Sequence, residues 1–342
     1  MQHVAIDLGG TESWICVRSE TGEILEEKPH RTASLPQYLR RQPPSRVVVE
    51  TCSEAFRVAD AALESQHQVR VVPATLVRSL GVGSRRTKTD QRDARILSEV
   101  SCRIDLPSVH LPTNQARERR SMCTVREQLV TSRTGLVNAV RGWARQHGVR
   151  IPTGTLARLP DRARAAALRT AEGLPEFVER ILVVIEALNA QIAAADDELQ
   201  RLAKADPVCQ RLMTVPGVGA MTALRFVAAI DDPTRFANAH SVSAYLGLTP
   251  GEHSSSKHKQ RTGITKAGPA PVRRVLVLAA WQFQRCRPLD PVVQWTKGVA
   301  ERRGKFVATV ALARKLSAIL YAVWRDGSRY EPQHQLRIQR EK

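Results

Sequence analysis

The fold is decided by the first strands of the chain, HVAIDLG (residues 3–9) and SWICVRS (residues 13–19). Both runs are rich in β-branched and apolar residues, and Gly9-Gly10-Thr11 supplies a tight turn between them. A second turn at Thr21-Gly22 leads towards a third strand. The pattern therefore predicts that the chain opens with a β-meander of three antiparallel strands.

Strands and helices alternate after this meander. A short helix over 35–41 ends before Pro43-Pro44, and RVVVE at 46–50 is an apolar strand. A helical pattern follows over 54–66, then a strand over 69–72. Alternating strands and helices are typical of an α/β layer fold.

The middle of the chain, from about 112 to 205, is helical. One helix is predicted over 115–147. A later one carries apolar residues with alternating spacings of four and three, the seam of a coiled coil sustained for four heptads: Leu174, Val178, Ile181, Ile185, Leu188, Ile192, Ala195, Leu199 and Leu202. Two arrangements remain open at this point, an antiparallel hairpin that spaces two domains and a dimer seam.

From Val208 onward the chain is mainly helical, with loops rich in glycine, serine and basic residues. VPGVG at 215–219 lies between two apolar helical segments, as in a helix-hairpin-helix motif. There Gly217 and Gly219 would let the backbone approach a phosphate next to a helix N-terminus. The alternative is a tight helical hairpin with no ligand.

The composition points to a polyanionic partner. The 342 residues include 52 Lys and Arg but only 33 Asp and Glu, which gives a formal charge of +19 and a pI near 10.5. Each Lys or Arg contact to a phosphate releases counterions and strengthens binding to nucleic acid; the alternative is a solvated basic surface. Because 42% of the residues are apolar, the chain can bury a core, and a disordered basic protein is excluded. Since only 4% of residues are aromatic, base stacking is expected to be minor.

Other classes of protein are disfavoured. The sequence contains no run of 18 apolar residues, so it predicts no membrane span, and its N-terminus does not have the pattern of a signal peptide. We therefore expect a cytoplasmic protein with no membrane partner. The six cysteines show no CxxC spacing, which argues against a zinc site or a disulfide framework.

Four carboxylates are candidates for a metal site. Asp7 lies inside the first apolar strand, where an uncompensated charge is costly, and Glu50 ends the 46–50 strand. Asp90 and Asp93 share one face at the start of a predicted helix that runs towards Ser101. Hard oxygen ligands favour Mg²⁺ or Mn²⁺, and two such ions can stabilise both reacting oxygens of a phosphodiester.

Each of these features has a simpler explanation. Asp90 is a plausible helix N-cap, and Asp93 a first-turn acid favoured by the helix dipole. Asp7-Leu8-Gly9-Gly10-Thr11 also resembles the phosphate-binding opening of sugar kinases and actin-like ATPases. That alternative expects a second Gly-rich loop, whereas it does not expect the coiled coil or the charge of +19.

A serine-rich segment is a second candidate site. YLGLTPGEHSSSK at 245–257 is predicted to end a helix in a polar loop, and GITKAG at 263–268 leads into a helix with Arg273 and Arg274. A serine there is a potential nucleophile if a base or metal assists loss of its proton and cations hold the phosphate. The alternative is an ordinary surface loop.

In combination these motifs resemble a known family. The strand Asp, the strand-end Glu, TKTDQRDAR at 87–95, the helical middle, VPGVG, GLTPGEHSSSK and GITKAG are similar to the insertion-sequence 110 transposases, relatives of the Piv DNA invertases. The resemblance covers about residues 1–325. It implies a RuvC-like, RNase H-type N-terminal domain with a DEDD metal site, a coiled-coil connector and a mainly α C-terminal transposase domain with a catalytic serine.

The resemblance assigns roles by position. The DEDD set is Asp7, Glu50, Asp90 and Asp93, the same four residues as above, and Ser254 aligns with the family's serine. The sequence departs from the family where Ser256 and Lys257 replace two glycines, which leaves Ser255 as an alternative nucleophile. It departs again at 268–271, Gly-Pro-Ala-Pro, where the family tends to have Gly-Asn. The expected phosphate contacts are Arg86, Lys88, Arg92, Gly217, Gly219, Lys257, Lys266, Arg273 and Arg274.

The resulting prediction is a DNA transposase or recombinase. Its domains are expected at 1–108 (RuvC-like), 109–206 (coiled coil), 207–328 (transposase) and 329–342 (basic tail). The resemblance further implies a structured bridge RNA that pairs with donor and target DNA, Mg²⁺ or Mn²⁺ as cofactor, and a homodimer or homotetramer. The alternatives are a metal-dependent nuclease of the Holliday-junction-resolvase type, a kinase-fold ATPase, and a non-enzymatic nucleic-acid binder.

Overall fold

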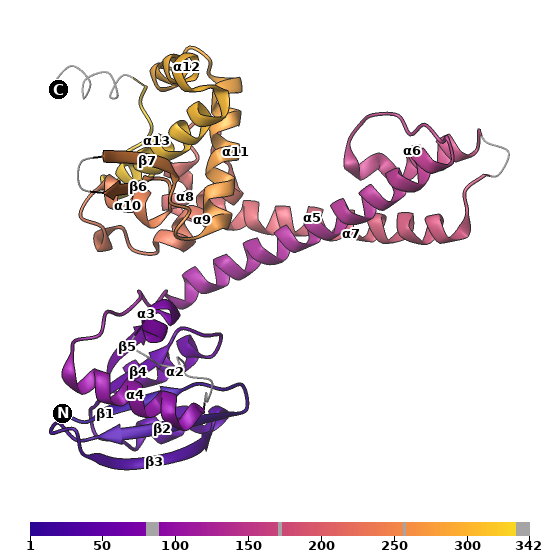
Figure 1. The fold of residues 1–342 in the computed structure, drawn as a ribbon. Helices are drawn as coiled ribbons and strands as arrows, with labels where there is room; N and C mark the ends of the chain where they lie inside the picture. Colours follow the sequence, from indigo (N-terminus) through magenta and orange to yellow (C-terminus); the bar gives the residue numbers. More distant parts are fainter. Residues whose placement is uncertain (80–88, 170–172, 256–257, 333–342) are drawn as a thin grey trace. The chain divides into compact units, whose positions relative to one another are not determined.

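The chain forms two compact units, residues 1–112 and 113–342 (Figure 1). The computed structural model describes residues 1–79, 89–169, 173–255 and 258–332. The domain boundaries expected at 108/109, 206/207 and 328/329 stay predictions. Each unit is described here by itself.

The first unit is built on a five-stranded sheet. Its strands are β1 (His3–Asp7), β2 (Glu12–Arg18), β3 (Ile24–Arg31), β4 (Arg46–Glu50) and β5 (Gln68–Val72). Their order is β3-β2-β1-β4-β5; β1, β2 and β3 pair antiparallel, whereas β1–β4 and β4–β5 pair parallel. The predicted meander followed by alternating strands and helices is confirmed.

Helices cover both faces of this sheet. They are α1 (Leu35–Arg40), which follows the 3-10 turn Thr32–Ser34, α2 (Ala55–Glu64), α3 (Ala74–Ser79) and α4 (Asp90–Arg103). Val4 and Ile6 pack with residues of α1 and α2, whereas Ala5 packs in a second cluster with Leu97 of α4. Because successive strand residues face opposite sides, the apolar run of β1 is buried on both faces.

The second unit begins with a long helical hairpin. α5 (Asn114–Gln146) starts at Thr113, whose hydroxyl accepts a hydrogen bond from Ala116 N, and α7 (Glu176–Ala205) packs along it. The helices run antiparallel, since Arg126 pairs with Asp196 and Arg133 bonds Asn189. Within the chain the hairpin arrangement therefore holds; a dimer seam is not tested.

Burial in α7 follows the heptad pattern. The positions Val178, Ile185, Ile192 and Leu199 are buried, and the intervening positions of the series are half-buried. Between the two helices lie a 3-10 turn (Leu156–Arg158) and α6 (Leu159–Ala167), whose Leu159 and Ala163 pack on α5 and α7. Packing within the chain thus buries four positions of the heptad series fully and the other positions partly.

The rest of the second unit is mainly helical. It contains α8 (Pro207–Leu212), α9 (Ala220–Ile230), a 3-10 turn (Pro233–Arg235), α10 (Ala239–Tyr245), the hairpin β6 (Pro250–Ser255) and β7 (His258–Ile264), α11 (Ala270–Cys286), α12 (Pro291–Arg303) and α13 (Lys305–Arg325). In the described residues only α13 is long and apolar enough to cross a membrane, but 56% of that window is buried in the unit. α13 packs against α8, α10, α11 and α12, so it acts as the core helix.

Two buried arginines anchor the long hairpin to this helical body. Arg119 of α5 pairs with Asp206, and both side chains are nearly inaccessible. Asp206 also caps α8, because its Oδ1 accepts from Val208 N and Cys209 N at 2.8 and 2.9 Å. Arg225 of α9 donates to the Cys123 carbonyl at 2.8 Å and pairs with Glu127 of α5.

Replacing Asp206 is expected to destabilise the second unit strongly. Asp206→Ala removes the helix cap and leaves Arg119 as a buried, unpaired charge, which together cost about 3 kcal/mol or more. Urea unfolding followed by circular dichroism measures this loss. Asp197→Ala, an exposed site on α7, the helix that Asp206 follows, is the matched control and should change the free energy of unfolding by less than about 0.5 kcal/mol. Equal effects of the two substitutions would contradict the proposed role of the pair.

Candidate active site

Two of the four predicted carboxylates lie at one edge of the sheet. β1 and β4 are adjacent and parallel, and the pairing between them ends with Ile6 opposite Val49. Asp7 and Glu50 each follow this pair by one residue, at the carboxyl ends of neighbouring strands. Since neighbouring strands lie about 4.8 Å apart, the two backbones come together at this edge.

α4 brings the other two carboxylates to the same edge. Ser101, near the end of α4, bonds His3 at the start of β1 at 2.8 Å, and Ser98 bonds Cys16 of β2 at 3.1 Å. The helix therefore runs antiparallel to β1. Eight residues of helix from Asp93 to Ser101 rise about 12 Å, and four residues of strand from His3 to Asp7 rise about 13 Å. Asp93 is thus level with Asp7.

Asp93 and Asp90 differ in burial. Asp93 is only 4% exposed, and its Oδ1 is one of the buried side-chain atoms with no hydrogen-bond partner. A buried carboxylate oxygen without a donor is costly, and a cation is the ligand that would satisfy it. Asp90 is exposed at the first position of α4. The N-cap position belongs to Thr89, so the alternative role of Asp90 as N-cap is wrong.

The four carboxylates do not form a closed cluster. Among the described residues, no three Asp, Glu, His or Cys side chains stand close enough to hold a metal ion as they are. Two strand ends and one helix start nevertheless supply oxygen donors, and Asp93 supplies a donor that nothing else occupies. This chemistry fits Mg²⁺ or Mn²⁺ better than a soft metal, because every candidate ligand is a carboxylate.

A peripheral ion pair holds the start of α4 against β3. Arg95 donates two hydrogen bonds of 2.6 Å to Glu27, and Gln91 donates a third of 3.0 Å to the same carboxylate. The hydrogen bonds from Arg95 hold the pKa of Glu27 below its usual value of 4.5. These contacts come from the helix turn that carries Asp90 and Asp93, so they set where that turn lies.

The serine segment is a β-hairpin and not the predicted loop. Ser254 lies in β6 opposite Lys259 of β7, and Ser255 lies opposite His258. The prediction failed because it took polarity as a sign of a loop, whereas the pairing of two extended backbones needs no apolar face. At the base of the hairpin, Thr265 N donates to Thr249 O at 2.9 Å. This bond extends the pairing beyond the strands.

The connection from β7 to α11 is fixed by close backbone contacts. Gly268 has φ of +111°, and a Cβ there would lie 2.0 Å from the Tyr245 carbonyl oxygen, so only glycine fits. Arg273 Nη1 donates to the carbonyls of Leu246 and Gly268, at 3.1 and 2.8 Å. The hairpin is therefore tied at its base to α10 and α11.

The predicted phosphate contacts have diverse surroundings. Arg92 and Lys266 are exposed, whereas Arg274 pairs with Glu127. Gly217, with φ of +83°, lies against α11, since a Cβ there would be 2.4 Å from Ala279 O, whereas a Cβ on Gly219 would meet open space. Packing alone thus explains Gly217. Arg86, Lys88 and Lys257 lie outside the described residues.

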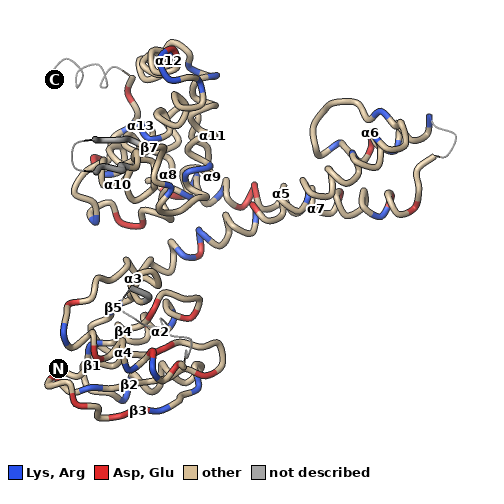
Figure 2. Tube along the Cα trace, viewed as in Figure 1, with Lys and Arg blue, Asp and Glu red and all other residues tan. Residues whose placement is uncertain are grey.

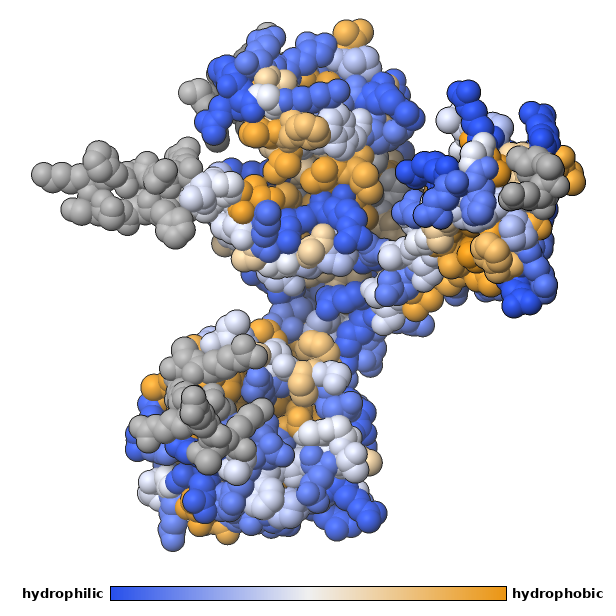
Figure 3. All heavy atoms as spheres, turned by 45° about the vertical axis from the view of Figure 1, so that its right-hand side comes forward, coloured by the Kyte–Doolittle hydropathy of each residue, from blue (hydrophilic) through white to orange (hydrophobic). Residues whose placement is uncertain are grey.

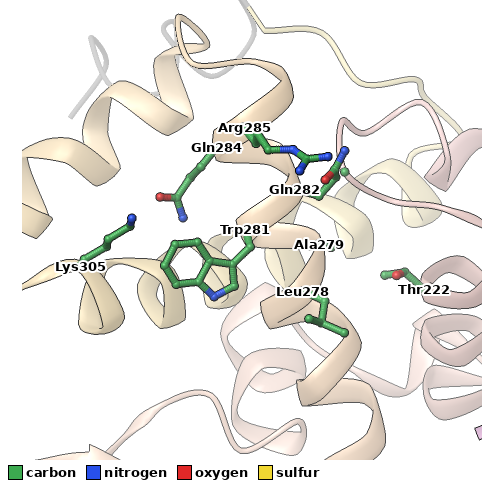
Figure 4. Close-up of a pocket in the computed structure, with 9 residues that line it drawn as sticks. Thr222, Leu278, Ala279, Trp281, Gln282, Gln284, Arg285 and Lys305 are labelled. Atoms are coloured by element: carbon green, nitrogen blue, oxygen red, sulfur yellow. The ribbon is translucent and has the colours of Figure 1, made fainter. Parts of the chain in front are cut away.

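The positive charge is distributed over both units. Lys and Arg lie along the long hairpin helices as well as on α11 and α12 (Figure 2). One feature among them has no signal in the sequence, the pairing of cations with aromatic rings. Lys305 Nζ lies 5.1 Å from the Trp281 ring centroid in a cavity of about 750 Å³ formed by α9, α11 and the start of α13 (Figure 4). The spacing of Trp281 and Lys305 in the sequence gives no sign of this contact.

Comparison with known proteins decides the family. Residues 4–148 match a family model for DEDD transposases of the IS110 type, and residues 209–291 match the model described as "Transposase IS116/IS110/IS902 family". The chain belongs to this family of transposases. The predicted resemblance is therefore confirmed, and the kinase-fold alternative receives no support from these matches.

Three proteins with related sequences align with more than two thirds of the chain. The chain is 33% identical over 242 residues to the transposase for insertion sequence element IS1111A of Coxiella burnetii, covering 69% of this chain and 66% of that one. It is 27% identical over 334 residues to the IS1328 transposase of Yersinia enterocolitica, covering 95% and 97%. The pilin gene-inverting protein of Moraxella bovis is 25% identical over 287 residues, covering 80% and 78%.

The contribution of Glu27 to stability is expected to depend on pH. A carboxylate whose pKa is lowered in the folded state stabilises it above the unfolded pKa, and this stabilisation disappears as the pH falls through the folded pKa. Glu27→Gln should therefore unfold at a lower temperature than wild type at pH 7, with the difference shrinking below pH 4.5. Thermal unfolding at several pH values measures this trend. A difference that is constant down to pH 3 would contradict it.

Proposed function

We propose that the protein cuts and rejoins DNA strands as a transposase, with the acidic edge of its first unit as a metal-dependent phosphodiester site. The observation that supports this most is the buried Asp93 oxygen without a partner, level with Asp7 at the edge where β1 and β4 end. The sheet order β3-β2-β1-β4-β5 fits a RuvC-like, RNase H-type domain, as the family match to residues 4–148 implies.

The four carboxylates have distinct roles in this proposal. Asp7, Glu50 and Asp93, from β1, β4 and α4, would hold the divalent ions, and the exposed Asp90 at the start of α4 would complete the set from the solvent side. Bound Mg²⁺ supplies charge that stabilises the reacting oxygens of the phosphodiester. Glu27 and Arg95 position the first turn of α4, and the exposed Arg92 contacts the DNA backbone.

Ser254 is proposed as the nucleophile of the joining chemistry. Its hydroxyl loses its proton to water as the oxygen attacks the scissile phosphorus. The bond from phosphorus to one deoxyribose oxygen breaks, and that oxygen takes up a proton from water as it leaves. The product is a serine–DNA phosphodiester that a second DNA hydroxyl can reverse. Lys266, exposed at the base of the hairpin, and Lys257 are proposed to hold the phosphate. Ser255 is the alternative nucleophile.

Guidance and assembly rest on the family resemblance. A structured bridge RNA would pair with donor and target DNA, so that the protein reads the shape and backbone of the duplexes. The charge of +19 suits a protein that holds two nucleic acids. Strand exchange needs several active sites at once, which is the reason to propose a homodimer or homotetramer.

The acidic site is tested by a conservative substitution. Asp93→Asn keeps the shape of the side chain but removes its charge, so cleavage of an element-end DNA in Mg²⁺ should fall by at least about 100-fold while DNA binding stays intact. Asp105→Asn is the matched control. Asp105 pairs with Arg46 and Arg70 at the start of β4 and in β5, and its loss should leave cleavage unchanged. Full cleavage by Asp93→Asn would refute the site.

The serine step is tested by trapping. A suicide substrate with a nick near the cleavage site should leave protein covalently attached to DNA after denaturation. Ser254→Ala should abolish this species, and Ser255→Ala should retain it. If neither wild type nor variants form a covalent species while DNA is still cut, the protein is a nuclease of the resolvase type and the serine mechanism is wrong.

A further inference from the structure

A large pocket adjoins the base of the serine hairpin. It has a volume of about 1040 Å³ and is formed by α10, the start of β6, the end of β7, α12 and α13. Pro250 at the start of β6 and Ile264 at the end of β7 contribute to its wall. The volume is at the upper end of the range of small-molecule sites. The pocket lies wholly within the second unit.

Aromatic rings and cations share the lining of this pocket. Trp295 is 37% exposed and Phe306 79% exposed, unusually high values for such large apolar side chains. The cations are Lys266, Arg303, Arg314 and Lys315. Lys315 Nζ lies 4.6 Å from the Trp295 ring centroid. None of the described residues that line the pocket is acidic, although Asp290 at the start of α12 acts electrostatically on Lys315.

This combination matches the chemistry of a nucleotide. An unstacked base offers a flat ring for an exposed Trp or Phe, and its phosphates need cations at the rim. Lys315 already lies over the Trp295 ring and Arg314 contacts His240. A purely apolar ligand would not use the cations Lys266 and Arg303, and a simple anion would not use the exposed Phe306 ring. The half-buried Lys315, whose pKa is lowered by burial, stays close to the aromatic wall.

We propose that this pocket receives an unstacked nucleotide of the DNA strand that reacts at the serine hairpin. The inference rests on the proposed function, because it takes that strand as the ligand. Four residues of extended strand separate Pro250 from Ser254, about 13 Å. A stacked DNA strand advances about 3.4 Å per nucleotide, so the pocket lies within about four nucleotides of the hairpin serine.

A neighbouring contact repeats the same pairing of ring and cation. Phe306 meets Trp281 of α11 edge-on, with ring centroids 6.3 Å apart. Lys305 extends towards Trp281 in the second cavity (Figure 4). On the face of the second unit that Figure 3 shows, apolar and strongly hydrophilic residues lie side by side. Three of the chain's aromatic residues, Trp281, Trp295 and Phe306, thus lie beside cations or beside one another, and in this proposal base stacking has a larger role than the 4% aromatic share predicts.

The test compares single-stranded with duplex DNA. The full-length protein is titrated at fixed salt with a fluorescent 12-nucleotide strand and with its duplex. Trp295→Ala should weaken single-strand binding about five-fold or more and leave duplex binding unchanged, whereas Trp295→Phe should retain most of the affinity. Phe177→Ala, an exposed aromatic on α7 outside the pocket, is the matched control and should change neither affinity.

A second variant keeps the test decisive if Trp295→Ala does not fold. Phe306→Ala removes an exposed ring from the first turn of α13 and should weaken single-strand binding in the same selective way. Equal weakening of single-strand and duplex binding, or no change in either affinity, would overturn the proposal that the pocket binds a nucleotide. A loss confined to an RNA strand of the same sequence would overturn its assignment to DNA.

The outcome is separable from that of the proposed function. Because this assay measures binding without cleavage, it does not depend on the carboxylates. Selective loss of strand binding alongside undiminished cleavage by Asp93→Asn would refute the acidic site and keep the pocket. Unchanged strand binding by Trp295→Ala alongside lost cleavage by Asp93→Asn would refute the pocket and keep the acidic site.

Discussion

The parallel pairing of β1 with β4 is the constraint on which the acidic edge depends. It places two strand ends side by side, and the antiparallel course of α4 over the same sheet adds the start of a helix. Hydrogen bonds between Ser98 and β2 and between Ser101 and β1 fix that course. A shift of α4 by one helical turn would displace Asp93 by about 5 Å along the sheet relative to Asp7. The carboxylates are therefore positioned by buried contacts far from the edge itself.

Buried ion pairs have a comparable role in the second unit. Arg119 and Arg225 are surrounded by apolar residues, and each is matched by one acid of the long hairpin or its end. Breaking such a pair is costly, which makes the attachment of the hairpin specific. Elsewhere in this unit, two lysines of α13, Lys305 and Lys315, lie over the rings of Trp281 and Trp295. Basic side chains thus stabilise the fold at one place and, in the proposed pocket, would bind a ligand at another.

Sequence patterns predicted most of the first unit because its signals are local. The apolar run of β1 and the turn at Gly9-Gly10 specify the meander without any tertiary information. Two features depended on contacts between distant segments and were not predictable. One is the pairing of Ser254 opposite Lys259 across a hairpin with no apolar alternation. The other is the pocket formed by α10, the β6–β7 hairpin, α12 and α13, where Lys315 lies over the Trp295 ring. That the four carboxylates form one site stays a prediction, whereas the burial of Asp93 arises from the packing of α4 on the sheet and has no signal in the sequence.

Binding of Mn²⁺ to the full-length protein tests the acidic edge most directly. Electron paramagnetic resonance counts free Mn²⁺ in solution, so it reports binding without any DNA or cleavage step. Wild type should remove Mn²⁺ from solution with saturation, and Asp7→Asn should weaken this binding by at least about ten-fold, since a negatively charged ligand is lost. Mn²⁺ binding that is equally strong in wild type and Asp7→Asn, or absent from both, would contradict a metal site at the edge where β1 and β4 end.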